Sequence, residues 1–216
     1  MTMAYTGDVA KGGPADVRTL GRLTITKVSV GPMDNNAYLL RCGDDQVLID
    51  AANDDDTLLG LIGPAGLSKV ITTHRHGDHW QALEDVVAKT GARSFAHTDD
   101  AEGIPVVTDT LTDGDTVTVG DCALEVIHLV GHTPGSIALL YRDPDGHGHL
   151  WTGDSLFPGG HGKTVTPGDH TSLMDDLEAK VFGRLPDDTW FYPGHGKDST
   201  LGAERPHLPE WRARGW

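Results

Sequence analysis

Four side chains that can bind metal ions lie within six residues of this sequence. They are His74, His76, Asp78 and His79. Imidazole nitrogens and carboxylate oxygens are good zinc ligands. The segment follows a short apolar run and precedes an amphipathic one, so we expect a loop, on which alternate side chains can converge as they do not on a regular helix. The spacing therefore predicts a metal site.

Three further candidates each follow a β-like run and each stand next to a glycine. They are His132, Asp154 and His195. Glycine allows the backbone to turn tightly and to approach a site closely. Loops at the ends of strands are a common place for functional side chains. We therefore expect all seven side chains to meet at one edge of a sheet.

The elements that must position these side chains are short strands mixed with a few helices. Strands are predicted at residues 23–30, 37–40, 47–49, 70–71, 116–119, 123–130, 137–141, 150–151 and 189–192, and helices at 53–62, at 80–91 and from Ser172 onward. Because strands and helices do not alternate regularly, the pattern favours a layered α+β domain. Residues 1–20 are predicted to form a loose N-terminal leader, and residues 21–216 a single domain.

The composition narrows the classes of partner. The chain has 216 residues and a formal net charge of −15, which argues against binding nucleic acid or an anionic membrane. No run approaches the roughly 20 apolar residues of a membrane span. Two cysteines, Cys42 and Cys122, cannot make a disulfide framework, and we expect both to be buried. The first 20 residues lack the apolar core of a signal peptide, so a cytoplasmic location is expected.

The seven residues together form a pattern of His-x-His-x-Asp-His, then Gly-His, Gly-Asp and Gly-His. Over about residues 22–205 this resembles the metallo-β-lactamase-fold superfamily. The resemblance implies a four-layer αββα sandwich with the metal site at one edge of the two sheets. It also implies two Zn²⁺ ions, one held by His74, His76 and His132, one by Asp78, His79 and His195, with Asp154 bridging them.

Within the superfamily, residues 152–163 resemble the loop after the bridging aspartate in glyoxalase II-type hydrolases. The lysine that matches Lys163 contacts the glutathione carboxylate in those enzymes, and His161 in the same loop is a second candidate for lining the substrate pocket. Two departures argue against glutathione. Val165 stands where glutathione-specific members have a tyrosine, and the chain ends at Trp216 without their added helical domain.

The implied activity is hydrolysis of a thioester, ester or lactone in a small-molecule substrate. A pair of divalent cations lowers the pKa of a shared water to about 7, so a metal-bound hydroxide can attack the carbonyl. Asp78 is the candidate catalytic residue that orients the nucleophile and returns a proton to the leaving group. The acyl group, the leaving group and the oligomeric state are not indicated by the sequence.

Two alternatives stay open. Similar proteins in the superfamily are persulfide dioxygenases, in which His74, His132 and Asp154 would hold one Fe²⁺. The other alternative is a metal-binding module without catalysis, which would not need a complete set of seven ligands.

The remaining histidines are expected to be structural or solvated. His97 and His128 flank strands and are predicted to be structural. A second group lies among turn residues and is predicted to be solvated: His147, His149, His170 and His207. Arg75, between two of the metal candidates, is expected to face solvent and could add positive charge near the site.

Overall fold

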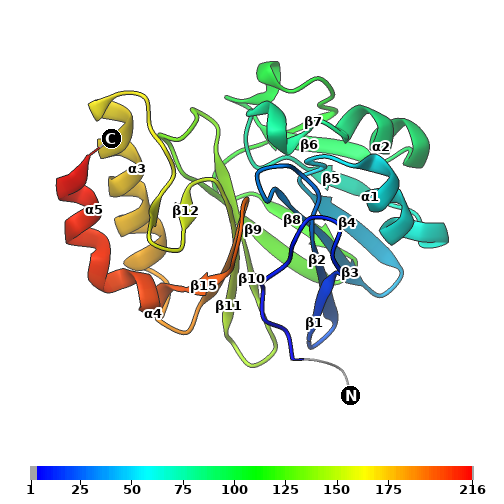
Figure 1. The fold of residues 1–216 in the computed structure, drawn as a ribbon, viewed down its shortest axis with the longest axis horizontal. Helices are drawn as coiled ribbons and strands as arrows, with labels where there is room; N and C mark the ends of the chain where they lie inside the picture. The colour runs from blue at the N-terminus through cyan, green and yellow to red at the C-terminus, as the bar shows by residue number, and fades with distance from the viewer. Residues whose placement is uncertain (1–3, 216) are drawn as a thin grey trace.

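Two β-sheets pack face to face in the computed structural model, which describes residues 4–215 (Figure 1). The first sheet has the order β1 (Asp16–Leu20), β2 (Leu23–Ser29), β3 (Asn36–Cys42), β4 (Asp45–Ile49), β5 (Lys69–Ile71), β6 (Arg93–His97) and β7 (Asp109–Leu111). The second sheet has the order β15 (Ser199–Thr200), β14 (Trp190–Pro193), β11 (Gly148–Gly153), β10 (Ile137–Arg142), β9 (Cys122–His128) and β8 (Thr116–Val119). A small hairpin, β12 (Leu156–Phe157) and β13 (Gly160–His161), stands apart from both sheets.

Helices cover the outer face of each sheet (Figure 1). On the first sheet lie α1 (Asp55–Ile62) and α2 (Leu83–Thr90). On the second lie α3 (Pro167–Asp176), a π-helical turn over Leu177–Phe182, α4 (Leu201–Glu204) and α5 (Leu208–Arg214). Short 3₁₀ turns occupy Gly63–Ala65, Gly77–His79, Ala101–Gly103 and Arg205–His207. The four-layer αββα sandwich expected from the sequence is confirmed.

Three apolar layers hold the sandwich together. The layer between the sheets includes Leu40, Trp151 and Tyr192; the layer under α1 and α2 includes Leu58, Val70 and Val86; the layer under α3 and α5 includes Leu173, Val181 and Phe191. All nine side chains are at most 2% exposed. Burial of one such side chain contributes roughly 1.5–3 kcal/mol, so the layers fix the strand ends rigidly.

Strand direction explains why distant loops share one edge. In the second sheet, β9 and β11 both run antiparallel to β10, and β14 runs parallel to β11. The carboxyl ends of β9, β11 and β14 therefore point to the same edge. The loop after β5 of the first sheet joins them there, because the Ile137 backbone N–H donates to the Thr73 carbonyl at 2.9 Å.

The structure corrects two expectations about the chain. The prediction of a loose leader over residues 1–20 is wrong for Asp16–Leu20, which forms β1 and pairs with β2; residues 1–3 lie outside the described part. The third helix begins at Pro167 and not at Ser172. Thr166 caps it, because its hydroxyl accepts from the backbone of Asp169 while the Asp169 carboxylate accepts from the backbone of Thr166.

Across residues 4–215, none of the helices combines the length and the apolar character that a membrane span requires.

Candidate metal centre

The loops at the shared edge bring together all seven predicted side chains. His74, His76, Asp78 and His79 follow β5, His132 follows β9, Asp154 follows β11, and His195 follows β14. Their nitrogen and oxygen atoms form three overlapping groups, each of three donors within 4.8 Å of one another. Donors spaced in this way can surround a metal ion.

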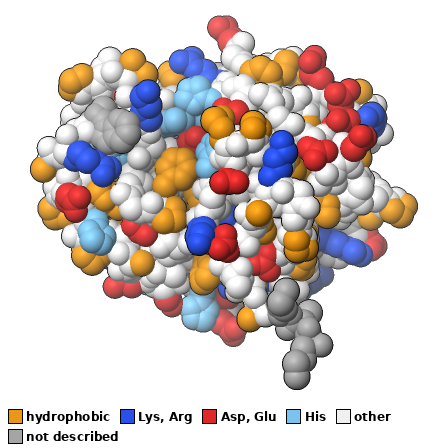
Figure 2. Space-filling model, in the orientation of Figure 1, with side chains coloured by type: hydrophobic (Ala, Val, Ile, Leu, Met, Phe, Trp, Pro, Cys, Tyr) orange, Lys and Arg blue, Asp and Glu red, His pale blue; other side chains and the backbone are white. Residues whose placement is uncertain are grey.

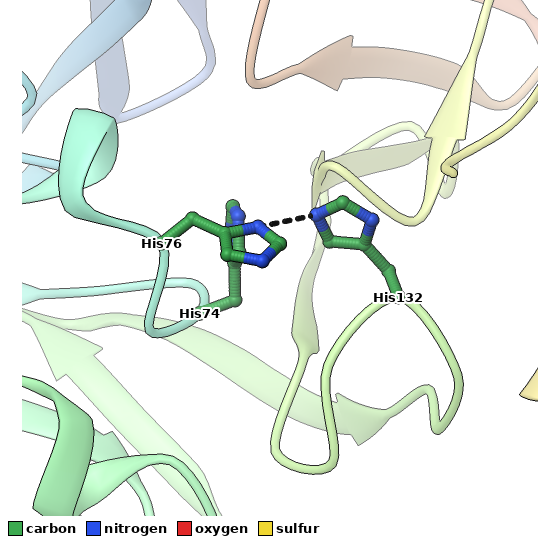
Figure 3. Close-up of side chains that lie close together, drawn as sticks. All are labelled: His74, His76 and His132. Atoms are coloured by element: carbon green, nitrogen blue, oxygen red, sulfur yellow. Dashed lines mark hydrogen bonds between the residues drawn. The ribbon is translucent and has the colours of Figure 1, made fainter. Parts of the chain in front are cut away.

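One group consists of His74, His76 and His132. Figure 3 shows the ring of His76 turned toward that of His132 across the gap between two loops, with His74 beside them. His76 Nδ1 and His132 Nε2 lie 2.9 Å apart. The His74 ring stands at 89° to that of His76 and at 70° to that of His132. Rings at such steep angles can direct their in-plane lone pairs at one point, which suits a metal ion.

A second group consists of Asp78, His79 and His195, and the third group, His74, His79 and Asp154, shares one residue with each of the first two. His79 Nε2 and His195 Nε2 lie 3.2 Å apart, and Asp78 Oδ2 is 3.3 Å from His195 Nε2. Asp78 belongs to the 3₁₀ turn at Gly77–His79, and its side chain is 24% exposed. This carboxylate is therefore accessible from solvent, whereas His79 is fully buried.

Asp154 lies between the two groups. One carboxylate oxygen is 3.2 Å from His79 Nε2, and the other lies 3.3 Å from His195 Nε2 and 3.7 Å from His132 Nε2. A single carboxylate therefore faces imidazoles of both groups, which is the placement that a bridging ligand requires.

The charges in the cluster prepare it for cations. Burial, reinforced by neighbouring imidazoles, holds the pKa of His74 well below its usual range, and burial likewise lowers the pKa of His132. Burial alone would also lower the pKa of His79, but the carboxylates of Asp154 and Asp50 outweigh it and raise that pKa well above the usual value. His74 and His132 are thus neutral ligands near pH 7, whereas His79 must release a proton when a metal binds.

Atoms without hydrogen-bond partners indicate that the cluster is built to hold ions. His74 Nε2 is buried and has no hydrogen-bond partner, and the buried Asp154 Oδ1 has only the ion-pair contact with His79 Nε2 described above. Unpaired buried polar atoms are costly unless something binds them. The backbone at Gly194 also approaches the cluster closely. A Cβ at this position would lie 2.2 Å from Asp154 Oδ1, so only glycine fits before His195. The donor set and its surroundings therefore fit two divalent cations.

The family of this chain is decided by a match along most of its length. Residues 30–195 match the model of the metallo-beta-lactamase superfamily, and this range holds all seven clustered side chains. The chain belongs to the metallo-β-lactamase superfamily.

Two relatives illustrate the similarity within this superfamily. The chain is 34% identical over 167 residues to a hydroxyacylglutathione hydrolase of Fuscovulum blasticum, covering 75% of this chain and 62% of the relative. It is 28% identical over 204 residues to the probable metallo-hydrolase YqgX of Bacillus subtilis, covering 85% of this chain and 95% of the relative. The chain thus spans about three fifths of the length of that hydroxyacylglutathione hydrolase.

Solved structures of the superfamily agree with the fold. ETHE1 from Myxococcus xanthus is 28% identical with a TM-score of 0.76, and the alignment covers 88% of this chain and 84% of that one. TTHA1623 in a di-iron-bound form is 32% identical with a TM-score of 0.70, covering 83% and 96%. Both resemble the chain in sequence as well as in fold, and the second is named as a di-iron-bound form.

Residues outside the superfamily pattern orient the clustered imidazoles, and sequence reasoning missed them. Asp50, directly after β4, lies 2.8 Å from His79 Nδ1 and also accepts from the backbone and hydroxyl of Thr73. The Asn35 amide donates to the Asp78 carboxylate at 2.9 Å. Such partners fix ring orientation and tautomer. The signal for Asp50 was available, since a buried strand ends in an acidic residue there.

Backbone carbonyls hold the remaining outward nitrogens. His132 Nδ1 donates to the Lys163 carbonyl at 2.8 Å, and His195 Nδ1 donates to the Met33 carbonyl at 2.8 Å. The other nitrogen of each ring, Nε2, faces the cluster. These bonds leave one free lone pair on each imidazole, directed inward.

The two predicted substrate-binding residues have different positions. Lys163 is exposed, and its carbonyl supports His132, while contact of its side chain with substrate stays a prediction. His161 is buried in the β12–β13 hairpin, where its ring packs against His170 with centroids 4.9 Å apart. It is absent from all the groups of possible metal donors found among residues 4–215.

A buried ion pair fixes the segment that carries His195. Lys27 Nζ donates to Asp198 at 2.6 Å, to the Gly196 carbonyl at 2.7 Å and to the Gly7 carbonyl at 2.7 Å. Both charged side chains are 0% exposed. The Tyr5 hydroxyl donates to the second oxygen of Asp198. The N-terminal segment is thus part of the support behind the cluster, and the loose-leader expectation fails here too.

Proposed function

We propose that this chain is a binuclear metal-dependent hydrolase that cleaves a thioester, ester or lactone. The observation that carries the proposal is the position of Asp154 between two complete groups of donors. The hydroxyacylglutathione hydrolase relative, a thioesterase by name, supports the reaction class. Two Zn²⁺ ions are the proposed cofactors, and such a pair supplies a strongly nucleophilic hydroxide at neutral pH and polarises a carbonyl oxygen.

The residues of the chain would divide the remaining work. His74, His76 and His132 would hold one cation, Asp78, His79 and His195 the other, and Asp154 both. Asp78 is the proposed catalytic acid–base group: its Oδ2 is held by Asn35, so the carboxylate has a fixed direction. In that position it would orient the attacking water, receive its proton and return that proton to the leaving group.

The test compares substrates and metals on the purified holoenzyme. Zinc-loaded protein is assayed with glutathione thioesters, thioesters of other thiols, and lactones. We expect turnover of at least one class, and a loss of about 10²–10⁴-fold in kcat for Asp78→Asn if it acts as acid and base. Absence of hydrolysis from every class, or full turnover by Asp78→Asn, would contradict the proposal.

A persulfide dioxygenase is the second candidate, supported by the similarity to ETHE1. Asp154 Oδ2 lies 3.9 Å from His74 Nε2 and 3.7 Å from His132 Nε2. These two histidines and one carboxylate would hold one Fe²⁺. Iron-loaded protein that consumes oxygen in proportion to added persulfide, with no thioester hydrolysis, would favour this function over the first.

We further propose a small-molecule substrate, no nucleic-acid or membrane partner, and a cytoplasmic location. The net charge of −15 opposes binding to polyanions. Figure 2 shows Lys and Arg side chains scattered among acidic ones on the face drawn there, without a basic stripe. Cys42 and Cys122 are buried and free, as is typical in reducing compartments. Cell fractionation and a gel-shift assay at low salt test these points.

A further inference from the structure

A groove of about 490 Å³ opens beside His132. Its lining includes Arg75, Val130, His132, Pro134, Val165 and Asp169. Two other grooves of similar size lie elsewhere in the described chain, and neither is lined by a member of the metal cluster. A substrate whose reacting bond lies at the metal centre can therefore extend into the groove at His132.

The backbone around Arg75 is fixed from two sides, and the stem of its side chain lies against a neighbouring loop. The Arg75 N–H donates to the Asp100 carboxylate at 2.9 Å, and the Arg75 carbonyl accepts from Trp80 Nε1 at 2.9 Å. The side-chain stem lies against Gly103, where a Cβ would come within 3.1 Å of Arg75 Cδ. Any larger residue at position 103 would displace the stem.

The guanidinium of Arg75 has unused donors. Its nearest carboxylate is Asp100, whose Oδ1 lies 3.8 Å from Nε, beyond hydrogen-bond distance. Asp100 is already occupied, because it accepts from the Thr133 hydroxyl and from the Gly135 N–H as well as from the Arg75 backbone. The Arg75 side chain is 46% exposed. Its fork of donors is thus available to a ligand.

The rest of the groove is lined by apolar side chains and by one carboxylate that already accepts hydrogen bonds. Val165 is 86% exposed, one of few large apolar side chains so exposed among residues 4–215. Val130 and Pro134 continue this wall. Asp169, the acid in the lining, already accepts from the backbone and hydroxyl of Thr166. Lys163 is not part of the lining.

We propose that this groove binds the carboxylate-bearing arm of the substrate, with Arg75 pairing the carboxylate and Val165 packing against an apolar spacer. This rests on the proposed hydrolase function and names its substrate class as thioesters or esters with a carboxylate on an alkyl arm. Arginine binds carboxylates with two parallel hydrogen bonds, and the pair is strongest where water is partly excluded. In a chain of net charge −15, such a local cation decides whether an anion can approach.

Binding of an uncleavable probe tests the groove separately from catalysis. An alkylthio-pentanoate, a thioether with a terminal carboxylate, and its methyl ester are titrated calorimetrically into zinc-loaded wild type and Arg75→Gln. We expect the wild type to prefer the carboxylate by about 10- to 100-fold, and Arg75→Gln to lose that preference. The methyl ester should bind both proteins alike.

Arg22→Gln is the matched control. Arg22 is also an exposed arginine beside a groove. It pairs with Asp121, which precedes β9, whereas His132 and the proposed groove lie after the other end of that strand. Arg22→Gln should keep the preference for the carboxylate. If the metal ions hold the carboxylate instead, Arg75→Gln will prefer the carboxylate over the methyl ester as strongly as the wild type does, and the inference is overturned.

Turnover separates this inference from the proposed function. With cleavable thioesters of the same two kinds, Arg75→Gln should raise KM for the carboxylate substrate and leave its kcat and the metal content unchanged. Loss of the binding preference in Arg75→Gln without hydrolysis by any protein would support the groove and reject the hydrolase. Hydrolysis together with an unchanged binding preference in Arg75→Gln would support the hydrolase and reject the groove.

Discussion

Histidine side chains meet both in the metal cluster and near the ends of β6 and β9, and the angles between their rings differ in the two regions. In the metal cluster the rings of His76 and His132 stand at 84° to one another, and those of His79 and His195 at 77°. Near the ends of β6 and β9, His97 and His128 are instead stacked at 24° with centroids 3.8 Å apart. Together with Asp99, these two histidines also place three potential metal donors within 4.8 Å of one another.

The difference teaches that proximity alone does not make a metal site. A metal ion lies in the plane of each imidazole that binds it, and two stacked planes do not converge on one point. The hydrogen bonds differ as well. His97 Nδ1 accepts from the backbone of Asp99, so the neutral ring carries its proton on Nε2 and keeps no free lone pair. His132 and His195 instead donate through Nδ1 and keep a lone pair on Nε2. We therefore expect metal in the first region and only packing in the second.

Matched substitutions of the two aspartates give the largest expected contrast. Asp154→Asn removes the carboxylate between the two groups of donors, and metal affinity should fall by more than about 100-fold, the upper end for a residue that only supports ligands. Asp99→Asn should leave metal content unchanged, because Asp99 is half-exposed at the edge of the stack. Metal analysis after dialysis against buffered free zinc measures both. Equal losses in the two variants would remove the distinction.

Substitution of an orienting residue should have an intermediate effect. Asp50→Asn weakens the contact with His79 Nδ1 while it keeps the size of the side chain. We expect metal affinity to fall by about 10- to 100-fold, with the group at His79 losing its ion first. Competition with a chromogenic chelator would reveal two separate affinities. If the affinity for the ion at His79 is the same in Asp50→Asn and in the wild type, Asp50 has no role in metal binding.

Asp100 connects two loops of the metal cluster, so its removal should affect stability more than chemistry. Its buried carboxylate accepts from Arg75, Thr133 and Gly135, and thereby links the loop of His74 and His76 to that of His132. Asp100→Ala leaves these donors unpaired and should lower the free energy of unfolding by about 2–4 kcal/mol. Urea unfolding of the metal-loaded protein measures the loss, and a change within experimental error would contradict the link.

The smallest expected effect concerns pH. Burial, and then the adjacent His128, lowers the pKa of His97 below 6.5. The folded state therefore favours neutral His97, and its contribution is complete above about pH 6.5, the unfolded value, and lost as the pH falls below it. His97→Gln should make stability less sensitive to pH in that range. Urea midpoints at several pH values test this, and parallel profiles for the two proteins would refute it.

The sequence determined the chemistry of the site because the relevant information was local. His74, His76, Asp78 and His79 lie on one loop, and glycines mark the places where His132 and His195 approach closely. Periodicity and turn residues also predicted most strands correctly, since alternation of apolar and polar residues is a local property. Cys42 and Cys122 are buried, as expected from their strands.

Contacts between distant segments produced what the sequence did not determine. His149 and His170, predicted to be solvated, are buried: His149 lies 3.0 Å from the Tyr192 hydroxyl, and His170 packs under α5 near the Trp211 carbonyl. Tyr5 and Gly7 are held in place by Lys27 and Asp198, two residues that lie 171 positions apart in the sequence.

The same reason explains the site. The local sequence shows which residues carry metal donors. It does not show which residues orient those donors or which residues line the groove beside them. Asp50 reaches His79 only because β4 and β5 run parallel. Arg75 borders the groove with Val130 and Pro134 only because the second sheet brings the loop after β9 beside it. Types and spacing of residues determine what chemistry is possible. Tertiary packing decides which partners orient the donors and which substrates can approach them, because those contacts exist only between segments that the fold brings together.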